Sequence, residues 1–319
     1  MTIRLGAGLW TMRSTGSRPA PFGGLYDDAV SAAIDAEACG FDSIWLAEHR
    51  FWYDGWCPQP IHVAAAMLAA TTSLHVGTAM YLLPQHAPAS AATTAQTCSD
   101  LSGGRLELGV SLGYRAEEYS GLGLDIRRRV GLMESALDHL DRRVPELPLW
   151  MGGMAPAAVV RAARRGIGLM LPPTLPRRKV GELIEQARRA AADAGRQPPP
   201  VGMLKDVWIG DDDTDARSFF VPRLRRHYAE YATAWWARGD DDQPDPAKVD
   251  AQIERSVEAA FVGSAATVAE QLGELAADGV SLFVLQFHSE QTDASARQQM
   301  QRIGRELLPL VRSYAGGPR

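Results

Sequence analysis

Cysteine is scarce in this sequence. The 319 residues contain only Cys39, Cys57 and Cys98, which lie far apart and form no CxxC pair. Disulfide frameworks and zinc sites depend on clustered cysteine and histidine residues, so neither is expected and no metal site is predicted. Cys39 and Cys98 fall in helical patterns and are interpreted as buried hydrophobic residues. Cys57 falls in a predicted loop, where it either packs in the core or faces a pocket.

Two further absences narrow the function. The chain has no uninterrupted apolar run of about 18 residues and no basic, then apolar, signal at its N-terminus. Its net charge is −5, with acidic and basic residues interspersed, so it offers no continuous basic face to nucleic acid. We therefore expect a cytoplasmic protein that binds neither a membrane nor nucleic acid.

The amino-acid composition is typical of an ordinary folded protein. Hydrophobic residues make up 46% of the chain and charged residues 22%, which is enough for a sizeable core. A length of 319 residues fits two average domains, or one β/α barrel of roughly 250 residues with insertions. The order of strands and helices is needed to choose between them.

Apolar runs alternate with helical patterns eight times along the chain. The predicted strands are residues 3–10, 42–47, 74–83, 105–112, 149–152, 168–171, 201–209 and 280–287. Helical patterns follow at 26–39, 61–72, 89–101, 130–142, 155–165, 179–194 and 296–311, with further helices up to 277 after the seventh strand. Continuous apolar strands, each followed by a helix, favour a closed (β/α)8 TIM barrel over an open doubly wound sheet. We expect one α/β domain over residues 1–319.

The segment 213–260 is longer than one connection between strands requires. It contains helical patterns with Trp235 and Trp236, then an acidic, proline-containing break at 239–246. We expect a helical insertion after strand seven. It would serve as a lid, as a subunit contact or only as a solvated insertion.

Residues with useful chemistry fall where predicted strands end. Glu48 and His49 follow the second strand, Trp10 ends the first, and His288 follows the eighth. The carboxyl ends of barrel strands form the rim that carries the active site, where histidine can act as a general acid or base. His49 is either such a residue or an ordinary surface histidine. His288 either faces the mouth of the barrel or contacts only water.

Two adjacent charged residues, Lys205 and Asp206, interrupt the apolar seventh strand. Because strand side chains alternate, one of the two must point into the barrel. Buried charges are rarely left unpaired, so we expect an ion pair within the barrel or with substrate.

Several segments, in their order and spacing, resemble one family. They are Glu48-His49, the strand Leu74–Pro84, the turn Ser102–Arg105, the run Gly113–Tyr119, Gly152-Gly153 and the segment Phe261–Ser264. Together they are similar to the bacterial luciferase-like flavin monooxygenase superfamily. The resemblance covers nearly the whole chain outside 213–260.

This resemblance implies a TIM barrel that binds reduced flavin mononucleotide (FMN) at its carboxyl-terminal mouth or, in one branch, the reduced deazaflavin coenzyme F420. The implied activity is a flavin-dependent monooxygenase that uses reduced FMN and O2 on a small or medium organic substrate. A separate flavin reductase would supply reduced FMN, and a homodimer would form through the second and third helices. The alternatives are an F420-dependent reductase or dehydrogenase and a non-catalytic partner subunit. Substrate identity depends on variable loops.

The resemblance also implies site residues. His49 resembles the family's catalytic histidine, and Glu48 either orients it or bonds to barrel backbone. A non-prolyl cis peptide is expected between Ala79 and Met80, and phosphate at the start of the helix after Gly153, where free N–H groups attract anions. The candidates for cofactor binding are Trp10, Ala79, Met80, Ser111, Tyr114, Gly152, Gly153, Met154 and Ala155, and those for the rim or for substrate are Arg50, Trp52 and His288.

Several positions depart from the family pattern. Arg50 stands where a second histidine is usual, as a fixed cation that would contact the flavin phosphate, an acidic substrate or a surface carboxylate. Leu112 replaces a phosphate-binding arginine, and Met154 and Ala155 replace hydroxyl residues. These changes favour the non-catalytic subunit. Tyr114 stands where the deazaflavin branch often carries an acidic residue, and it favours the flavin branch.

Overall fold

The computed structural model describes residues 2–12, 21–51, 56–235, 245–288 and 294–315. The predicted rim residue Trp52 and most of the break at 239–246 lie outside the described residues. Within the described part of the chain, no helix is both long and apolar enough to cross a membrane.

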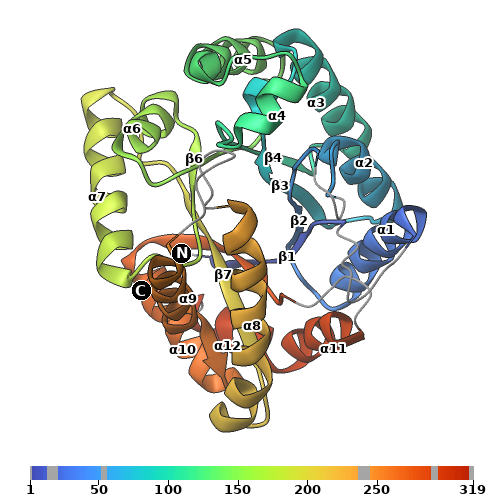
Figure 1. The fold of residues 1–319 in the computed structure, drawn as a ribbon, viewed down its shortest axis with the longest axis vertical. Coiled ribbons are helices and arrows are strands. Elements are labelled where there is room, and N and C mark those ends of the chain that lie inside the picture. The colour runs from blue at the N-terminus through green and yellow to red at the C-terminus, as the bar shows by residue number, and fades with distance from the viewer. Residues whose placement is uncertain (1, 13–20, 52–55, 236–244, 289–293, 316–319) are drawn as a thin grey trace.

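Eight parallel strands close into a barrel, which confirms the predicted (β/α)8 fold (Figure 1). Around the barrel the strands run β1 (Arg4–Trp10), β2 (Ser43–Leu46), β3 (His75–Tyr81), β4 (Leu106–Val110), β5 (Leu149–Gly152), β6 (Gly168–Leu171), β7 (Val201–Ile209) and β9 (Val280–Gln286), which pairs with β1. A further strand, β8 (Phe261–Gly263), pairs with the carboxyl end of β7. The sequence did not predict β8, because three residues are too short for a periodic signal.

Helices surround the barrel (Figure 1). They are α1 (Phe22–Ala38), α2 (Pro60–Ala70), the short 3-10 turn η1 (Leu83–Gln85), α3 (Pro88–Ser102), α4 (Ala116–Gly121), η2 (Ile126–Arg128), α5 (Arg129–Arg143), α6 (Pro156–Arg165), α7 (Arg177–Asp193), α8 (Asp213–Trp235), α9 (Pro246–Ala259), α10 (Ala265–Asp278), α11 (Ala294–Arg302), the π-helical turn η3 (Ile303–Leu307) and α12 (Leu308–Ala315). Proline begins α2, α3, α6 and α9, where its fixed φ suits a helix start and its missing N–H costs nothing. The range 213–260 contains α8 and α9.

Two tryptophans fill the interior of the barrel. The Trp45 and Trp150 ring centroids lie 6.3 Å apart, edge to face. Each indole N–H has a buried acceptor, Ser43 Oγ at 2.8 Å for Trp45 and Glu107 Oε2 at 2.8 Å for Trp150. Gly77 makes room for them, because a Cβ there would lie 2.4 Å from Trp45. The barrel is therefore a packed core, and a ligand must bind beyond it, at the mouth formed by the carboxyl ends of the strands.

Trp10 lies in the outer core between barrel and helices, not in the mouth. The pairing register of β1 with β2 shifts between Ala7 and Trp10. Beyond the shift, Leu9 packs with the interior cluster, whereas Trp10, 3% exposed, packs in the outer core. The prediction that Trp10 contacts cofactor or substrate was wrong, because its place at a strand end does not reveal the register shift.

Candidate functional site

His49 lies just beyond β2 at the mouth, and its side chain is buried against a carboxylate. Its Nδ1 atom is 2.7 Å from Oε1 of Glu118, a fully buried residue on α4. The His49 ring packs edge-on against Trp56, with centroids 4.7 Å apart, and near Tyr114 at 6.1 Å. His49 is therefore not an ordinary surface histidine, because the buried Trp56 ring and a carboxylate fix its ring in place.

Several hydrogen bonds keep Glu118 ionised despite its burial. Oε2 accepts from Gln85 Nε2 at 3.0 Å, and Oε1 also accepts from the backbone N–H of Arg50 at 3.2 Å. Burial alone would raise the pKa of Glu118, but the hydrogen bonds with His49 and Gln85 outweigh it and lower that pKa. An ionised carboxylate only accepts, so the neutral His49 ring carries its proton on Nδ1 and leaves Nε2 as its proton acceptor.

Glu48 bonds to backbone and to two other side chains, and none of its hydrogen bonds or ion pairs joins His49. Its carboxylate accepts from the Leu82 N–H at 2.7 Å and contacts His86 Nε2 at 2.8 Å. It also pairs with Arg50 Nη1 at 2.5 Å. Of the two roles left open by the sequence, bonding to barrel backbone is observed, and the residue that orients His49 is Glu118.

Arg50 is a buried cation and not a rim residue. It is only 8% exposed, and besides the Glu48 pair its Nη1 donates to Gln85 Oε1 at 2.9 Å. Gln85 in turn donates to Glu118. Glu48, His49, Arg50, Gln85, His86 and Glu118 thus form one connected set, which we call the His49 network. Of the contacts left open for Arg50, the salt bridge to a carboxylate is observed, but it is buried and not on the surface.

Gln85, His86 and Glu118 were not identified as site residues from sequence. His86 stacks on the Tyr81 ring, with centroids 3.9 Å apart, and reaches Glu48 from the turn after β3. Glu118 lies 69 residues from His49. The one usable signal was position, since β3 and β4 both end at the mouth and these residues follow them closely.

The predicted ring-binding residues form an apolar floor next to the His49 network. The Ala79–Met80 bond is cis, as expected, and a second cis bond joins Gly8 and Leu9. Met80 packs against Gly152, where an added Cβ would lie 2.7 Å from Met80 Cγ. Ala79 is buried beside Met80 in the interior cluster. This floor suits the face of a flat heteroaromatic ring.

The predicted phosphate position opens α6. Ala155 is its N-cap residue and Pro156 its first residue, and the neighbouring Met154 side chain is 53% exposed. Leu112, which stands in place of an arginine, packs against the outer core. A phosphate here would rely on backbone N–H groups and the helix dipole, without a side-chain cation from position 112.

A second polar group lies on the β7 and β9 side of the mouth. Asp206 accepts hydrogen bonds from His288 Nε2 at 2.5 Å and from the Tyr228 hydroxyl at 2.7 Å. The ring of His227 on α8 lies tilted against that of His288, with ring centroids 3.9 Å apart. His288 therefore contacts a carboxylate and a second ring, which excludes one of the two alternatives, a histidine that contacts only water.

One of the two adjacent charges points inward and is paired, as the sequence suggested, and this is Asp206 with His288. Lys205 Nζ instead lies 3.2 Å from the Pro173 carbonyl and 4.2 Å above the Phe261 ring. Burial lowers the pKa of Lys205 to about 8, and the nearby Asp206 offsets this only in part. The strand alternation separates the two charges, with Asp206 facing the mouth and Lys205 the helical layer.

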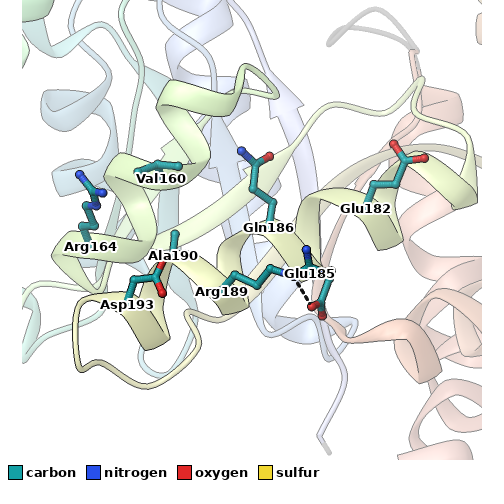
Figure 2. Close-up of a pocket in the computed structure, with 8 residues that line it drawn as sticks. All are labelled: Val160, Arg164, Glu182, Glu185, Gln186, Arg189, Ala190 and Asp193. Atoms are coloured by element: carbon teal, nitrogen blue, oxygen red, sulfur yellow. Dashed lines mark hydrogen bonds and ion pairs between the residues drawn. The ribbon is translucent and has the colours of Figure 1, made fainter.

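A shallow groove of about 420 Å³ lies on the outer surface between α6 and α7 (Figure 2). Its lining is mostly charged and includes the exposed Glu185–Arg189 pair, 2.8 Å apart on one helix. No strand residue lines it. The groove is a solvated helix surface and holds none of the site residues described above.

Known proteins resemble this chain in both sequence and fold. An alkanal monooxygenase alpha chain from the Kryptophanaron alfredi symbiont is 34% identical over 117 residues, 37% of this chain and 33% of that relative's length. The chain thus spans about a third of this relative. The luciferase-like monooxygenase of Escherichia coli K12 is 32% identical over 178 residues, 54% of this chain and 50% of its own length.

The fold likeness extends over the whole barrel. The oxygenating constituent of 3,6-diketocamphane monooxygenase from Pseudomonas putida, solved with FMN, superimposes with a TM-score of 0.76 at 19% identity, over 97% of this chain and 98% of that one. A family model described as luciferase-like monooxygenase matches residues 7–282. The chain therefore belongs to the luciferase-like monooxygenase family.

Proposed function

We propose that this protein is a monooxygenase that uses reduced FMN and O2 on a small or medium organic substrate. The observation that carries the proposal is the buried His49–Glu118 pair at the mouth, 2.7 Å apart, beside an apolar floor and a helix start. The floor suits the face of a flavin ring, and the N-terminus of α6 suits its phosphate.

Reduced FMN, when bound, supplies the electrons that activate O2. The protein supplies position and protons. Glu118 holds the His49 ring and fixes its tautomer, so Nε2 can accept or deliver a proton at the mouth. The apolar floor at Ala79 and Met80 would exclude water from one face of the ring.

Two observations favour FMN over F420. The relatives with the clearest sequence likeness include an alkanal monooxygenase chain, and a similar fold was solved with FMN. At position 114 the chain has tyrosine, next to His49, and not the acidic residue that the deazaflavin branch often carries.

One observation supports the alternative, an F420-dependent reductase or dehydrogenase. An F420-dependent secondary alcohol dehydrogenase superimposes with a TM-score of 0.74 at 19% identity, over 98% of this chain and 99% of that one. In such an enzyme His49 would exchange a proton with a hydroxyl group next to the site of hydride transfer.

We also propose a homodimer through α2 and α3, and a separate reductase as the source of reduced FMN. Leu101 near the end of α3 is 82% exposed, and Ala66, Ala69 and Ala70 line the exposed face of α2. Small side chains permit close helix packing, and an exposed leucine beside them suits an interface.

Anaerobic titration of the purified protein with reduced FMN and with reduced F420 tests the proposal. The complex is then mixed with isotopically labelled O2 and a straight-chain alkanal or a cyclic ketone. We expect tighter binding of reduced FMN and label in the oxidised product. Binding of F420 alone, with no O2 consumed, would identify a dehydrogenase, and binding of neither would identify a non-catalytic subunit.

A further inference from the structure

The side-chain oxygen of Gln286 is buried and accepts no hydrogen bond from the described residues. Val284 packs inside the barrel, whereas Leu285 and Phe287 pack in the outer core. Because strand side chains alternate, Gln286 points inward, one level nearer the mouth than Val284. It is only 8% exposed, and its Oε1 atom has no hydrogen-bond partner among the described residues.

The neighbours of Gln286 across the sheet cannot satisfy this atom. On one side it pairs with Gly8, which has no side chain. On the other side it pairs with Asp206, whose carboxylate only accepts and already holds His288 and Tyr228. Buried polar groups in native proteins almost always have partners, so an unmet acceptor at a ligand-binding mouth indicates a donor from outside the chain.

His288 offers a second acceptor two residues further along the same strand end. Its Nε2–H donates to Asp206, so the neutral ring keeps Nδ1 as an acceptor. The other contacts of His288 with described residues are ring contacts with Phe220, His227 and Tyr228. The nearby carboxylate of Asp206 also disfavours an anionic group at this position.

We propose that Gln286, with His288 beside it, forms a ligand position at the carboxyl end of β9 that takes an N–H or O–H donor of a neutral group on a small molecule. Two sources share this chemistry, the ring N–H of the cofactor and a hydroxyl or amine of the substrate. The inference rests on the proposed function for the presence of a flavin at the mouth. Beyond that function, the inference names Gln286 and His288 as the residues that accept the hydrogen bond from this donor.

The test compares Gln286→Met with wild type, because methionine keeps the side-chain length and removes the acceptor. Gln271→Met is the matched control, since Gln271 on α10 also has a buried Oε1 without a partner among the described residues but lies outside the barrel. Dissociation constants are measured for reduced FMN and for cyclohexanol, together with the melting temperature of each ligand-free protein.

We expect Gln286→Met to weaken binding of one of the two probes about tenfold, a loss of about 1.4 kcal/mol, and the probe affected identifies the source. Its ligand-free melting temperature should equal or exceed that of wild type, because the unmet acceptor is gone. Gln271→Met should leave both dissociation constants unchanged. If Gln286→Met does not fold, His288→Phe is measured in its place, with the same tenfold expectation.

Dissociation constants within twofold of wild type for both probes would overturn the proposal. If wild type does not bind cyclohexanol, the reduced FMN measurement alone decides. If wild type binds neither reduced FMN nor F420, the proposed function fails. The melting temperature of ligand-free Gln286→Met then still tests whether Gln286 Oε1 lacks a hydrogen-bond donor in the protein. A melting temperature below that of wild type would overturn this claim.

Discussion

Nδ1 of His49 lies 2.7 Å from Oε1 of Glu118, and both side chains are buried. The pair joins the end of β2 to α4, which follows β4, so it spans the mouth between strands that are not adjacent. Glu118 fixes the orientation and the tautomer of His49, which a general acid or base requires.

Replacing Glu118 with glutamine should lower turnover about 10- to 100-fold, because His49 loses the carboxylate that fixes its ring and its tautomer. The neighbouring Glu117→Gln is the matched control, since the Glu117 side chain is half exposed and its carboxylate lies 3.9 Å from Arg115. Steady-state rates across pH measure the effect. Equal rates for the two variants would show that the pair has no catalytic role.

Replacing Arg50 with methionine should destabilise the protein by about 3–5 kcal/mol, because Glu48 is left as a buried charge without its cation. Arg127→Met is the control, since the Arg127–Asp125 pair is exposed and solvent screens such pairs, so its loss should change stability little. Urea unfolding measures both free energies. Losses of the same size in the two variants would contradict a special role for the buried pair.

Glu107 should stabilise the fold at neutral pH and lose that effect in acid. Burial would raise the pKa of Glu107, but bonds from His75, Arg4 and Trp150 outweigh it and lower the pKa from 4.5 to about 2. The contribution is present above pH 4.5, amounts to about 3 kcal/mol, and disappears as pH falls through about 2.

Glu107→Gln measures this contribution. The difference in unfolding free energy between wild type and variant should shrink between pH 5 and pH 2, from about 3 kcal/mol toward zero. Glu185→Gln, on the exposed face of α7, should show little difference at any pH. If the difference in unfolding free energy between wild type and Glu107→Gln does not change with pH, the lowered pKa of Glu107 is refuted.

Gly77→Ala should destabilise the barrel by about 1–3 kcal/mol, because the new Cβ would lie 2.4 Å from the Trp45 ring. Gly131→Ala in α5 is the opposite case, since nothing lies within 4 Å of a Cβ there. Alanine is the better helix former, so this variant should gain about 0.5–1 kcal/mol. Thermal unfolding that moves both variants in the same direction would disprove the packing argument.

The barrel was predictable from sequence because each strand is a continuous apolar run. β5, β6 and β7 have the predicted bounds, and β1 starts one residue late. The positions of these strands were predicted correctly, but the direction in which the Trp10 side chain points was not. Trp10 ends the predicted strand, but the register shift before it turns its side chain to the outer core, and no periodicity in the sequence marks that shift.

The site was predictable as a place and only partly as a set of contacts. The strand ends located His49 at the mouth and His288 on the same rim. The partners Glu118 and Asp206 depend on contacts across 69 and 82 residues, which local patterns do not encode. Gln286 escaped notice because a glutamine at a strand end looks ordinary until its buried oxygen is found without a donor.

The central claim is that His49 exchanges protons at the mouth of the barrel, where the flavin is proposed to bind. The variant His49→Ala tests this claim most directly. Affinity for reduced FMN is measured by anaerobic titration. The rate at which the complex with reduced FMN oxidises a substrate of the wild type in the presence of O2 is then measured. We expect affinity within about threefold of wild type and a substrate oxidation rate about 10²- to 10⁴-fold lower. Retained binding with an unchanged rate would contradict the account.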